Sequence, residues 1–136
     1  SRSKLDTYAD LQREAASLAD DINERHGDAN FKPVRLVIRH HEPDEVFELF
    51  RAADVCVVSS LHDGMNLVAK EFVASRLDQR GMLILSEFAG AADELTDAIL
   101  VNPHDPDAIL AAMNTALTAL SPRTRRRSWR ARRSNA

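Results

Sequence analysis

The chain has 136 residues, of which 44% are hydrophobic and 29% are charged, and its formal net charge is −3. This composition is typical of a globular protein in water, and the length predicts one domain with a hydrophobic core rather than two. A membrane-spanning helix is excluded because no run approaches the roughly 18 consecutive apolar residues of a span, and no apolar signal segment follows the N-terminus.

The first half of the chain predicts two helices and two strands. Apolar residues at spacings of three and four predict an amphipathic helix over residues 5–25, followed by Gly27 as its cap: Leu11, Ala15, Leu18 and Ile22. The β-branched run 34–38 predicts a short buried strand, and Pro43 begins a second amphipathic helix with acidic residues in its first turn. The unbroken apolar run 55–58 predicts a strand buried on both faces of a parallel sheet.

The second half continues the same alternation. A helix after Asn66 is expected to turn Val68, Ala69 and Phe72 inward. Strands are expected at 82–85 and 98–101, separated by a small-residue segment, 87–92, that can pass close to a ligand or to a neighbouring backbone. After a turn at 102–106, a last helix is expected to bury Ile109, Met113, Ala116, Leu117 and Leu120.

This alternation predicts the α/β class, a Rossmann-like parallel sheet flanked by helices and joined by right-handed crossovers. Ligands of such sheets bind beyond the carboxyl ends of the strands. The candidate site therefore lies in the loops that contain His40 and His41, residues 59–66 and residues 87–90.

Cys56 is the single cysteine, and it lies within the apolar run 55–58. We interpret it as a buried, reduced thiol rather than a reactive one, because no neighbouring residue would lower its pKa. One unpaired cysteine is typical of the cytoplasm, so a cytoplasmic location is expected.

The positive charge is concentrated at the end of the chain. Seven of the 18 Lys and Arg residues are arginines within 121–136, which has no acidic residue, so residues 1–120 hold 11 basic and 21 acidic residues. Such an acidic body is a poor surface for nucleic acid. The Arg-rich tail alone has the charge to bind nucleic acid or an anionic membrane, but we expect a disordered end or an out-of-frame, non-native sequence, and neither of those partners. The missing initiator Met suggests that the chain begins inside a larger protein.

The most informative motif is the segment 63–71, Asp-Gly-Met-Asn-Leu-Val-Ala-Lys-Glu, which follows the predicted strand 55–58. A strand, a glycine turn and a helix start bring several backbone N–H groups to one point, where the helix dipole favours an anion such as phosphate. Asp63 and Glu71 would add acceptors for sugar hydroxyls. From the spacing alone, a helix-terminal charge and an exposed surface acid are equally good interpretations of these two residues.

Other polar residues give weaker signals. His40 and His41 follow a predicted strand, but a hydrogen-bonded loop is a commoner role for such a pair than a base or a ligand. Lys70 has the length to reach a phosphate, although a solvated helix lysine is at least as common. His62 stands beside Asp63, yet no spacing of Cys, His and carboxylates resembles a metal site, and no metal or cofactor is expected.

The segment 63–71 closely resembles the signature of the trehalose-6-phosphate synthase family of retaining glucosyltransferases. Segments 85–95 and 101–103 look like the two that follow it in that family, and residues 50–55 and the pair Arg39 and His40 are also similar. The resemblance covers about residues 1–120 and stops at 121–136. It implies a GT-B glycosyltransferase, in which two Rossmann-like domains face each other across a cleft, with residues 1–120 forming most of the nucleotide-sugar-binding domain.

The resemblance also implies roles for particular residues toward UDP-glucose. Asp63 would accept hydrogen bonds from the glucose hydroxyls, and Glu71 would bind the ribose hydroxyls. His40 would lie in the loop that approaches the uracil through backbone groups, beside His41, where the family often has an aromatic residue. Backbone amides would bind the sugar and the diphosphate: those of Gly64, Met65 and Asn66 the sugar, those of Leu67 and Val68 the diphosphate.

What the resemblance implies for the activity is transfer of glucose from UDP-glucose to glucose 6-phosphate, with retention and without a metal. The Arg/Lys pair expected at the phosphates and the acceptor-binding N-terminal domain are not found in this sequence, so no complete catalytic set is present and the chain alone is expected not to turn over. Two alternatives stay open: a sister transferase with another phosphorylated acceptor such as glycerol 3-phosphate, and a non-catalytic nucleotide-sugar-binding module. The oligomeric state is left open.

Overall fold

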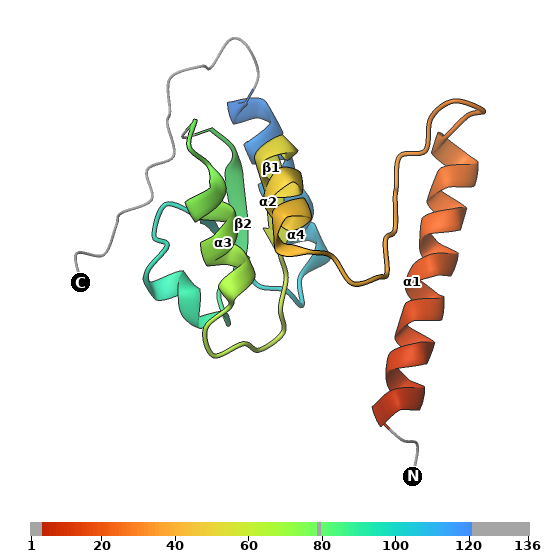
Figure 1. Ribbon diagram of the computed structural model, residues 1–136, viewed down its shortest axis with the longest axis horizontal. Coiled ribbons are helices and arrows are strands. Elements are labelled where there is room, and N and C mark those ends of the chain that lie inside the picture. The colour runs from red at the N-terminus through yellow and green to blue at the C-terminus, as the bar shows by residue number, and fades with distance from the viewer. Residues whose placement is uncertain (1–3, 79, 121–136) are drawn as a thin grey trace. The chain divides into compact units, whose positions relative to one another are not determined.

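The computed structural model describes residues 4–78 and 80–120 (Figure 1). Contacts divide the chain into two compact units, one up to His40 and one from His41 onward, and each is described by itself. The expectations for the tail at 121–136 lie outside the described residues. Among the residues that are described, no helix combines the length and the apolar character needed to cross a membrane.

The first unit consists of helix α1 (Lys4–His26) and an irregular segment after it. The helix confirms the prediction from the apolar spacing, and the amide of Gly27 donates to the carbonyl of Asn23 at 2.8 Å just past its end. The strand expected at 34–38 is wrong, because these residues form no strand. An apolar run becomes a strand only where a neighbouring strand satisfies its backbone. Within 34–38, only the backbone of Val34 has such partners, and both are on the Asn23 side chain: the Val34 amide donates to Oδ1 at 2.8 Å, and its carbonyl accepts from Nδ2 at 2.9 Å.

The second unit alternates helices and strands, as the sequence predicts (Figure 1). In chain order it contains α2 (Pro43–Ala52), β1 (Val55–Val58), α3 (Leu67–Ser75), β2 (Met82–Ser86), the 3₁₀ turn η1 (Gly90–Asp93), β3 (Ile99–Val101) and α4 (Pro106–Ala119). The three strands are parallel in the order β1-β2-β3, with Val58 opposite Leu85 and Ser86 opposite Val101. The α/β class with a parallel sheet is thereby confirmed.

Helices cover both faces of this sheet. On one face, Phe72 and Ala69 of α3 pack against Leu83 and Leu85 of β2, and Phe50 of α2 meets the Phe72 ring edge-on at 5.9 Å. On the other face, Ala112 and Ala116 of α4 pack against Ile84 and Val101. The alternation of β2 residues between two apolar layers explains why its sequence is an unbroken apolar run.

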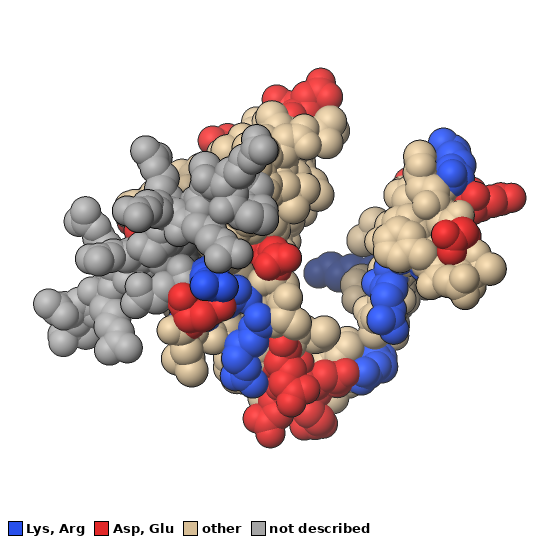
Figure 2. Space-filling model, turned by 90° about the horizontal axis from the view of Figure 1, so that it is seen from above, with Lys and Arg blue, Asp and Glu red and all other residues tan. Residues whose placement is uncertain are grey.

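Three of the expected inward side chains are exposed instead. Val68 on α3 and both Met113 and Leu117 on α4 face away from the core. On α4 the buried stripe runs through alanines, which are small enough to let a helix lie close to a sheet. The larger apolar residues one position further on are then turned to the surface. In the drawn view, acidic side chains gather in one group at the lower centre, and basic side chains lie beside it (Figure 2).

Candidate functional site

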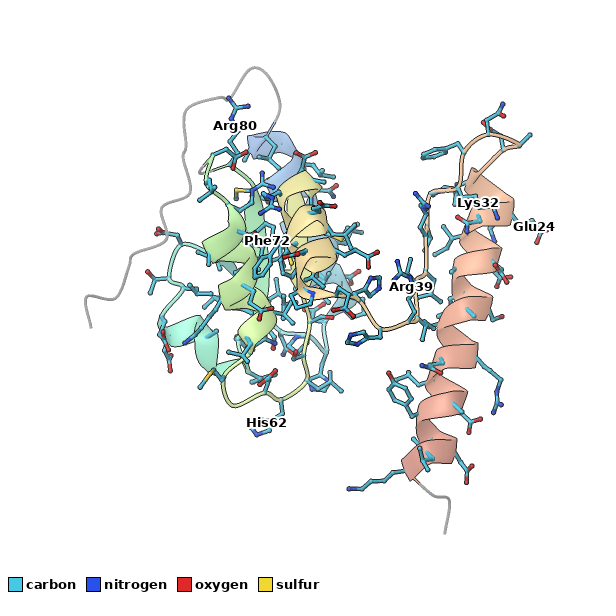
Figure 3. All side chains as sticks on the ribbon, in the orientation of Figure 1. Glu24, Lys32, Arg39, His62, Phe72 and Arg80 are labelled. Carbon is cyan, nitrogen blue, oxygen red and sulfur yellow. The ribbon has the colours of Figure 1, made fainter. Side chains whose placement is uncertain are left out.

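Two loops meet beyond the carboxyl ends of β1 and β2. Asp63 and Ala89 form a parallel β-bridge, in which the Asp63 amide donates to the Phe88 carbonyl at 3.4 Å and the Gly90 amide donates to the Asp63 carbonyl at 2.9 Å. The loop that carries His62 and the segment around Arg80 lie at opposite ends of this unit (Figure 3). Residues 59–66 and 87–90, two of the loops in which the topology predicted a site, are thus in contact.

Gly90 allows the two loops to approach each other. A Cβ at this position would lie 2.0 Å from the carbonyl oxygen of Gly64 and 2.8 Å from its carbonyl carbon. A Cβ on Gly64 itself would meet nothing within 4 Å. The small-residue segment therefore passes close to a neighbouring backbone, one of the two roles predicted for it, while Gly64 faces open space.

The Asp63 carboxylate is engaged within its own turn. Its Oδ1 accepts the amides of Met65 at 3.1 Å and Asn66 at 3.0 Å, and its Oδ2 accepts the side-chain amide of Asn66 at 3.0 Å. These bonds form a tight acid-centred turn of the kind that Asp supports. Three of the approximately four acceptor positions of the carboxylate are used, so Oδ2 keeps room for one further donor.

Asn66 ends the turn and begins α3. Its backbone is left-handed, with φ 63° and ψ 85°, and its side chain is buried. The side-chain Oδ1 accepts the amide of Ala69 at 2.9 Å, and Nδ2 donates to the hydroxyl of Ser60 at 3.1 Å as well as to Asp63. Asn66 is therefore the N-cap of α3, and its side chain ties the helix to the turn.

The amides of Leu67 and Val68 are the unsatisfied donors of this helix start. Neither donates to an acceptor among residues 4–78 and 80–120, and both residues are exposed. The cap reaches only the third amide of the helix, so the first two stay available at the positive end of its dipole. The result is a pair of exposed backbone donors beside a carboxylate that can still accept one hydrogen bond.

The remaining predicted residues, Glu71, Lys70 and His40, have different surroundings. Glu71 is exposed on α3, and its carboxylate has no hydrogen bond or ion pair with another described residue. Lys70 donates to both carboxylate oxygens of Glu94 at 2.8 and 2.9 Å, so its ammonium is already paired. His40 belongs to the other unit, where it is exposed and its carbonyl accepts a bond from the Arg39 side chain at 3.2 Å.

Cys56 lies within β1, half-buried against the α3 face of the sheet. Burial raises the pKa of its thiol. This agrees with the prediction of an unreactive cysteine, because the thiolate is the nucleophilic form. Within residues 4–78 and 80–120, no three His, Cys, Asp or Glu side chains are grouped as metal ligands.

Two contributors to the turn were not predicted from the sequence. Ser60 lay in a candidate loop without a role, and the side chain of Asn66 was given none, although its backbone was. Asn directly before a helix is a signal for an N-cap and would have predicted the bond to Ala69. No local pattern predicts the contact with Ser60, because it forms between opposite ends of the loop.

The chain resembles known proteins over most of its length. The model of glycosyltransferase family 20 matches residues 1–135. A trehalose-6-phosphate synthase of Salmonella arizonae is 44% identical over 119 residues, and one of Escherichia coli O1:K1 is 42% identical over 119 residues. Both alignments cover 87% of this chain but 25% of the relative, so the chain spans about a quarter of the length of these curated relatives.

Solved structures agree with the sequence relatives. A structure described as trehalose-6-phosphate from E. coli bound with UDP-2-fluoro glucose has a TM-score of 0.81 at 42% identity, covering 89% of this chain and 27% of that one. An alpha,alpha-trehalose-phosphate synthase (UDP-forming) from Burkholderia xenovorans, in complex with glucose-6-phosphate, has a TM-score of 0.80 at 38% identity, covering 86% and 26%. The parallel sheet and its flanking helices thus match part of these enzymes, and the chain belongs to glycosyltransferase family 20 as a homologue of trehalose-6-phosphate synthase.

Proposed function

We propose that this chain is the UDP-glucose-binding part of an alpha,alpha-trehalose-phosphate synthase, which transfers glucose from UDP-glucose to glucose 6-phosphate with retention. Family membership supports the proposal, as do the names of the relatives. So do the ligands named for two similar structures, UDP-2-fluoro glucose in one and glucose-6-phosphate in the other. In the GT-B arrangement, residues 1–120 form most of the nucleotide-sugar-binding domain.

The observation that carries the proposal is the pair of unsatisfied amides at Leu67 and Val68. A diphosphate is an anion with several acceptor oxygens, and two adjacent N–H groups at the start of a helix bind such an anion with the help of the helix dipole. In a transfer from UDP-glucose, negative charge grows on the leaving UDP. Donors held in place before the reaction stabilise that charge without reorganisation.

The sugar would lie over the preceding turn. Asp63 accepts a glucose hydroxyl at the free position of Oδ2, and the open space at Gly64 lets the sugar come close to the backbone. The amides of Met65 and Asn66 already donate to Asp63, so each would contact the sugar through a bifurcated hydrogen bond that Asp63 and a sugar oxygen accept together. The Gly64 amide has no acceptor among the described residues and is the donor most available to the sugar.

The nucleoside would be bound by Glu71, the last residue of the segment 63–71, and by His40, which lies outside that segment. Glu71 has an exposed carboxylate without a described partner, which suits the two adjacent hydroxyls of a ribose. His40 would meet the uracil through backbone groups, as the family resemblance implies. The 136-residue chain is proposed to bind the donor without transferring glucose, because it corresponds to about a quarter of the relatives' length.

Calorimetric titration of the purified chain with UDP and with UDP-glucose tests this function. Binding is expected at millimolar ligand, together with no trehalose 6-phosphate when glucose 6-phosphate is added. The absence of UDP binding would contradict the donor site, and formation of trehalose 6-phosphate would contradict the expected inactivity. Glu71→Ala should weaken UDP binding by about 1–3 kcal/mol, because ribose hydroxyls lose their acceptor. Glu48→Ala, which removes an exposed acid from α2, should leave the affinity unchanged.

A further inference from the structure

The backbone conformation of Asn66 is unusual among the residues that the structure describes. Among residues 4–78 and 80–120 it is the one non-glycine residue with positive φ, and it is 6% exposed. Asn tolerates this left-handed region better than most residues, but the conformation persists only where surrounding contacts stabilise it. The contacts of the Asn66 side chain therefore stabilise this backbone conformation.

Both the oxygen and the nitrogen of the Asn66 side-chain amide form hydrogen bonds. Oδ1 accepts from the Ala69 amide, while Nδ2 donates to Asp63 and to Ser60. Turning the amide over would place its NH₂ group against the Ala69 N–H and its oxygen against the Asp63 carboxylate. The network therefore admits one orientation, with one acceptor toward the helix and two donor bonds toward the loop.

This requirement explains why an amide, rather than a simpler N-cap, occupies the position. An Asp at 66 would accept from Ala69 equally well, but it would bring a second carboxylate against Asp63 and remove both donor bonds. A Ser is too short to bond to the helix amide and to both loop residues. Among small side chains, the carboxamide alone caps the helix and also donates to Asp63 and Ser60.

The choice of Ala69 as the capped amide decides which donors remain. Asx caps bond the second or the third amide of a helix, and here the bond goes to the third. The amides of Leu67 and Val68 stay unpaired as a result. Ser60 fixes this choice from the far side of the loop, since its hydroxyl accepts one of the two Nδ2 hydrogens.

We propose that Asn66 and Ser60 are positioning residues, which hold the turn so that the Leu67 and Val68 amides face a bound diphosphate. Neither side chain touches the ligand in this role. The inference rests on the proposed function, because that function supplies the diphosphate. It goes further because the Ser60 hydroxyl and the Asn66 carboxamide would raise the affinity for the diphosphate by holding the backbone amides in place.

The test uses Ser60→Ala and Asn66→Gly in the whole chain, with UDP as the probe. Ser60→Ala removes one acceptor from the network, and Asn66→Gly keeps the left-handed backbone but removes the side chain. Amide spectra recorded during UDP titration should show affinities weaker by about threefold for Ser60→Ala and about tenfold for Asn66→Gly. The UDP-induced shifts of the Leu67 and Val68 amides should also be smaller than in the unmodified chain.

Ser75→Ala is the matched control. The buried Ser75 hydroxyl donates to the Phe72 carbonyl at 2.7 Å, at the other end of the same helix, so its loss lowers stability without reaching the turn. UDP affinity and the two amide shifts should be unchanged in this variant. If the unmodified chain binds no UDP, the proposed function fails. If it binds and both test variants bind equally well, with the same amide shifts, the positioning role alone is overturned.

Discussion

The two ends of α3 use similar chemistry for opposite results. At the N-terminal end, the side chains of Asp63 and Asn66 bond the backbone of the turn but leave two helix amides unpaired. At the C-terminal end, Arg76 lies almost fully buried, with its side chain 4% exposed, and donates to carbonyl oxygens from two segments of the chain. One end leaves donors available, and the other leaves few acceptors unused.

The Arg76 end is a closed network. Its Nη1 lies 2.9 Å from the Phe50 carbonyl oxygen and 2.7 Å from those of Arg51 and Ala53, and its Nε lies 2.7 Å from that of Arg80. These bonds satisfy two carbonyls in the last turn of α2 and that of its C-cap, and the guanidinium carbon also lies 5.8 Å from the centre of the Phe72 ring. A buried polar network that is satisfied in this way stabilises the fold. One that leaves exposed donors, as at Leu67 and Val68, leaves them available to water or to a ligand.

The largest effect is expected at the closed end. Arg76→Met should lower the free energy of unfolding by about 3 kcal/mol, because four carbonyl oxygens lose a charged donor whose side chain is itself buried. Urea unfolding followed by circular dichroism measures this. Arg76→Lys should recover part of the loss, since it keeps the charge but not the forked geometry. A change below about 0.5 kcal/mol for Arg76→Met would break the contrast between the two ends.

A smaller effect on stability, joined to an effect on binding, is expected for Gly90→Ala. The added Cβ would overlap the Gly64 carbonyl, so the two loops must separate. We expect a loss of about 2 kcal/mol in the free energy of unfolding and UDP binding weakened by about tenfold. Unchanged affinity in a folded variant would show that the contact between the loops does not set the shape of the turn.

The smallest effect on stability is expected for Gly64→Ala, the matched control for Gly90→Ala. Its Cβ meets nothing within 4 Å and its φ is not positive, so the free energy of unfolding should stay within about 1 kcal/mol of its original value. UDP affinity should be unchanged, while UDP-glucose should bind more weakly because the methyl group occupies the space assigned to the sugar. Equal titration curves for UDP-glucose before and after the change would contradict that placement.

The core strands could be predicted from the sequence because burial on both faces leaves an unbroken apolar run. This holds for residues 82–85, which the structure places in β2. The run 55–58 forms β1 as predicted, but at the edge of the sheet, where Val57 is exposed, so burial on both faces is wrong for this strand. The run at 34–38 has the same local signal but forms no strand, because pairing depends on a neighbour that no local pattern encodes. Helix faces were predicted less well. The buried stripe of α3 passes through Ala69, Phe72 and Ser75, and this leaves Val68 outside it.

The contact between the two loops could be predicted from the sequence, but the contacts within the turn could not. The motif at 63–71 and the positions of the strand ends were enough to predict where the loops meet. The bonds from Asp63 to two amides, and from Asn66 to Ser60, depend on the path of the turn in three dimensions. The pairing of Lys70 with Glu94 joins residues 24 positions apart and has no local signal either.

We propose that the amides of Leu67 and Val68 are the donors that bind the diphosphate. Amide hydrogen and nitrogen shifts of the ¹⁵N-labelled chain, recorded while UDP is added, report on these two donors themselves. Leu67 and Val68 should show the largest shifts and move together along one binding curve, whereas amides at the Arg76 end of α3 should stay in place. Saturating UDP that leaves Leu67 and Val68 unmoved, or that moves the Arg76 end instead, would contradict the claim.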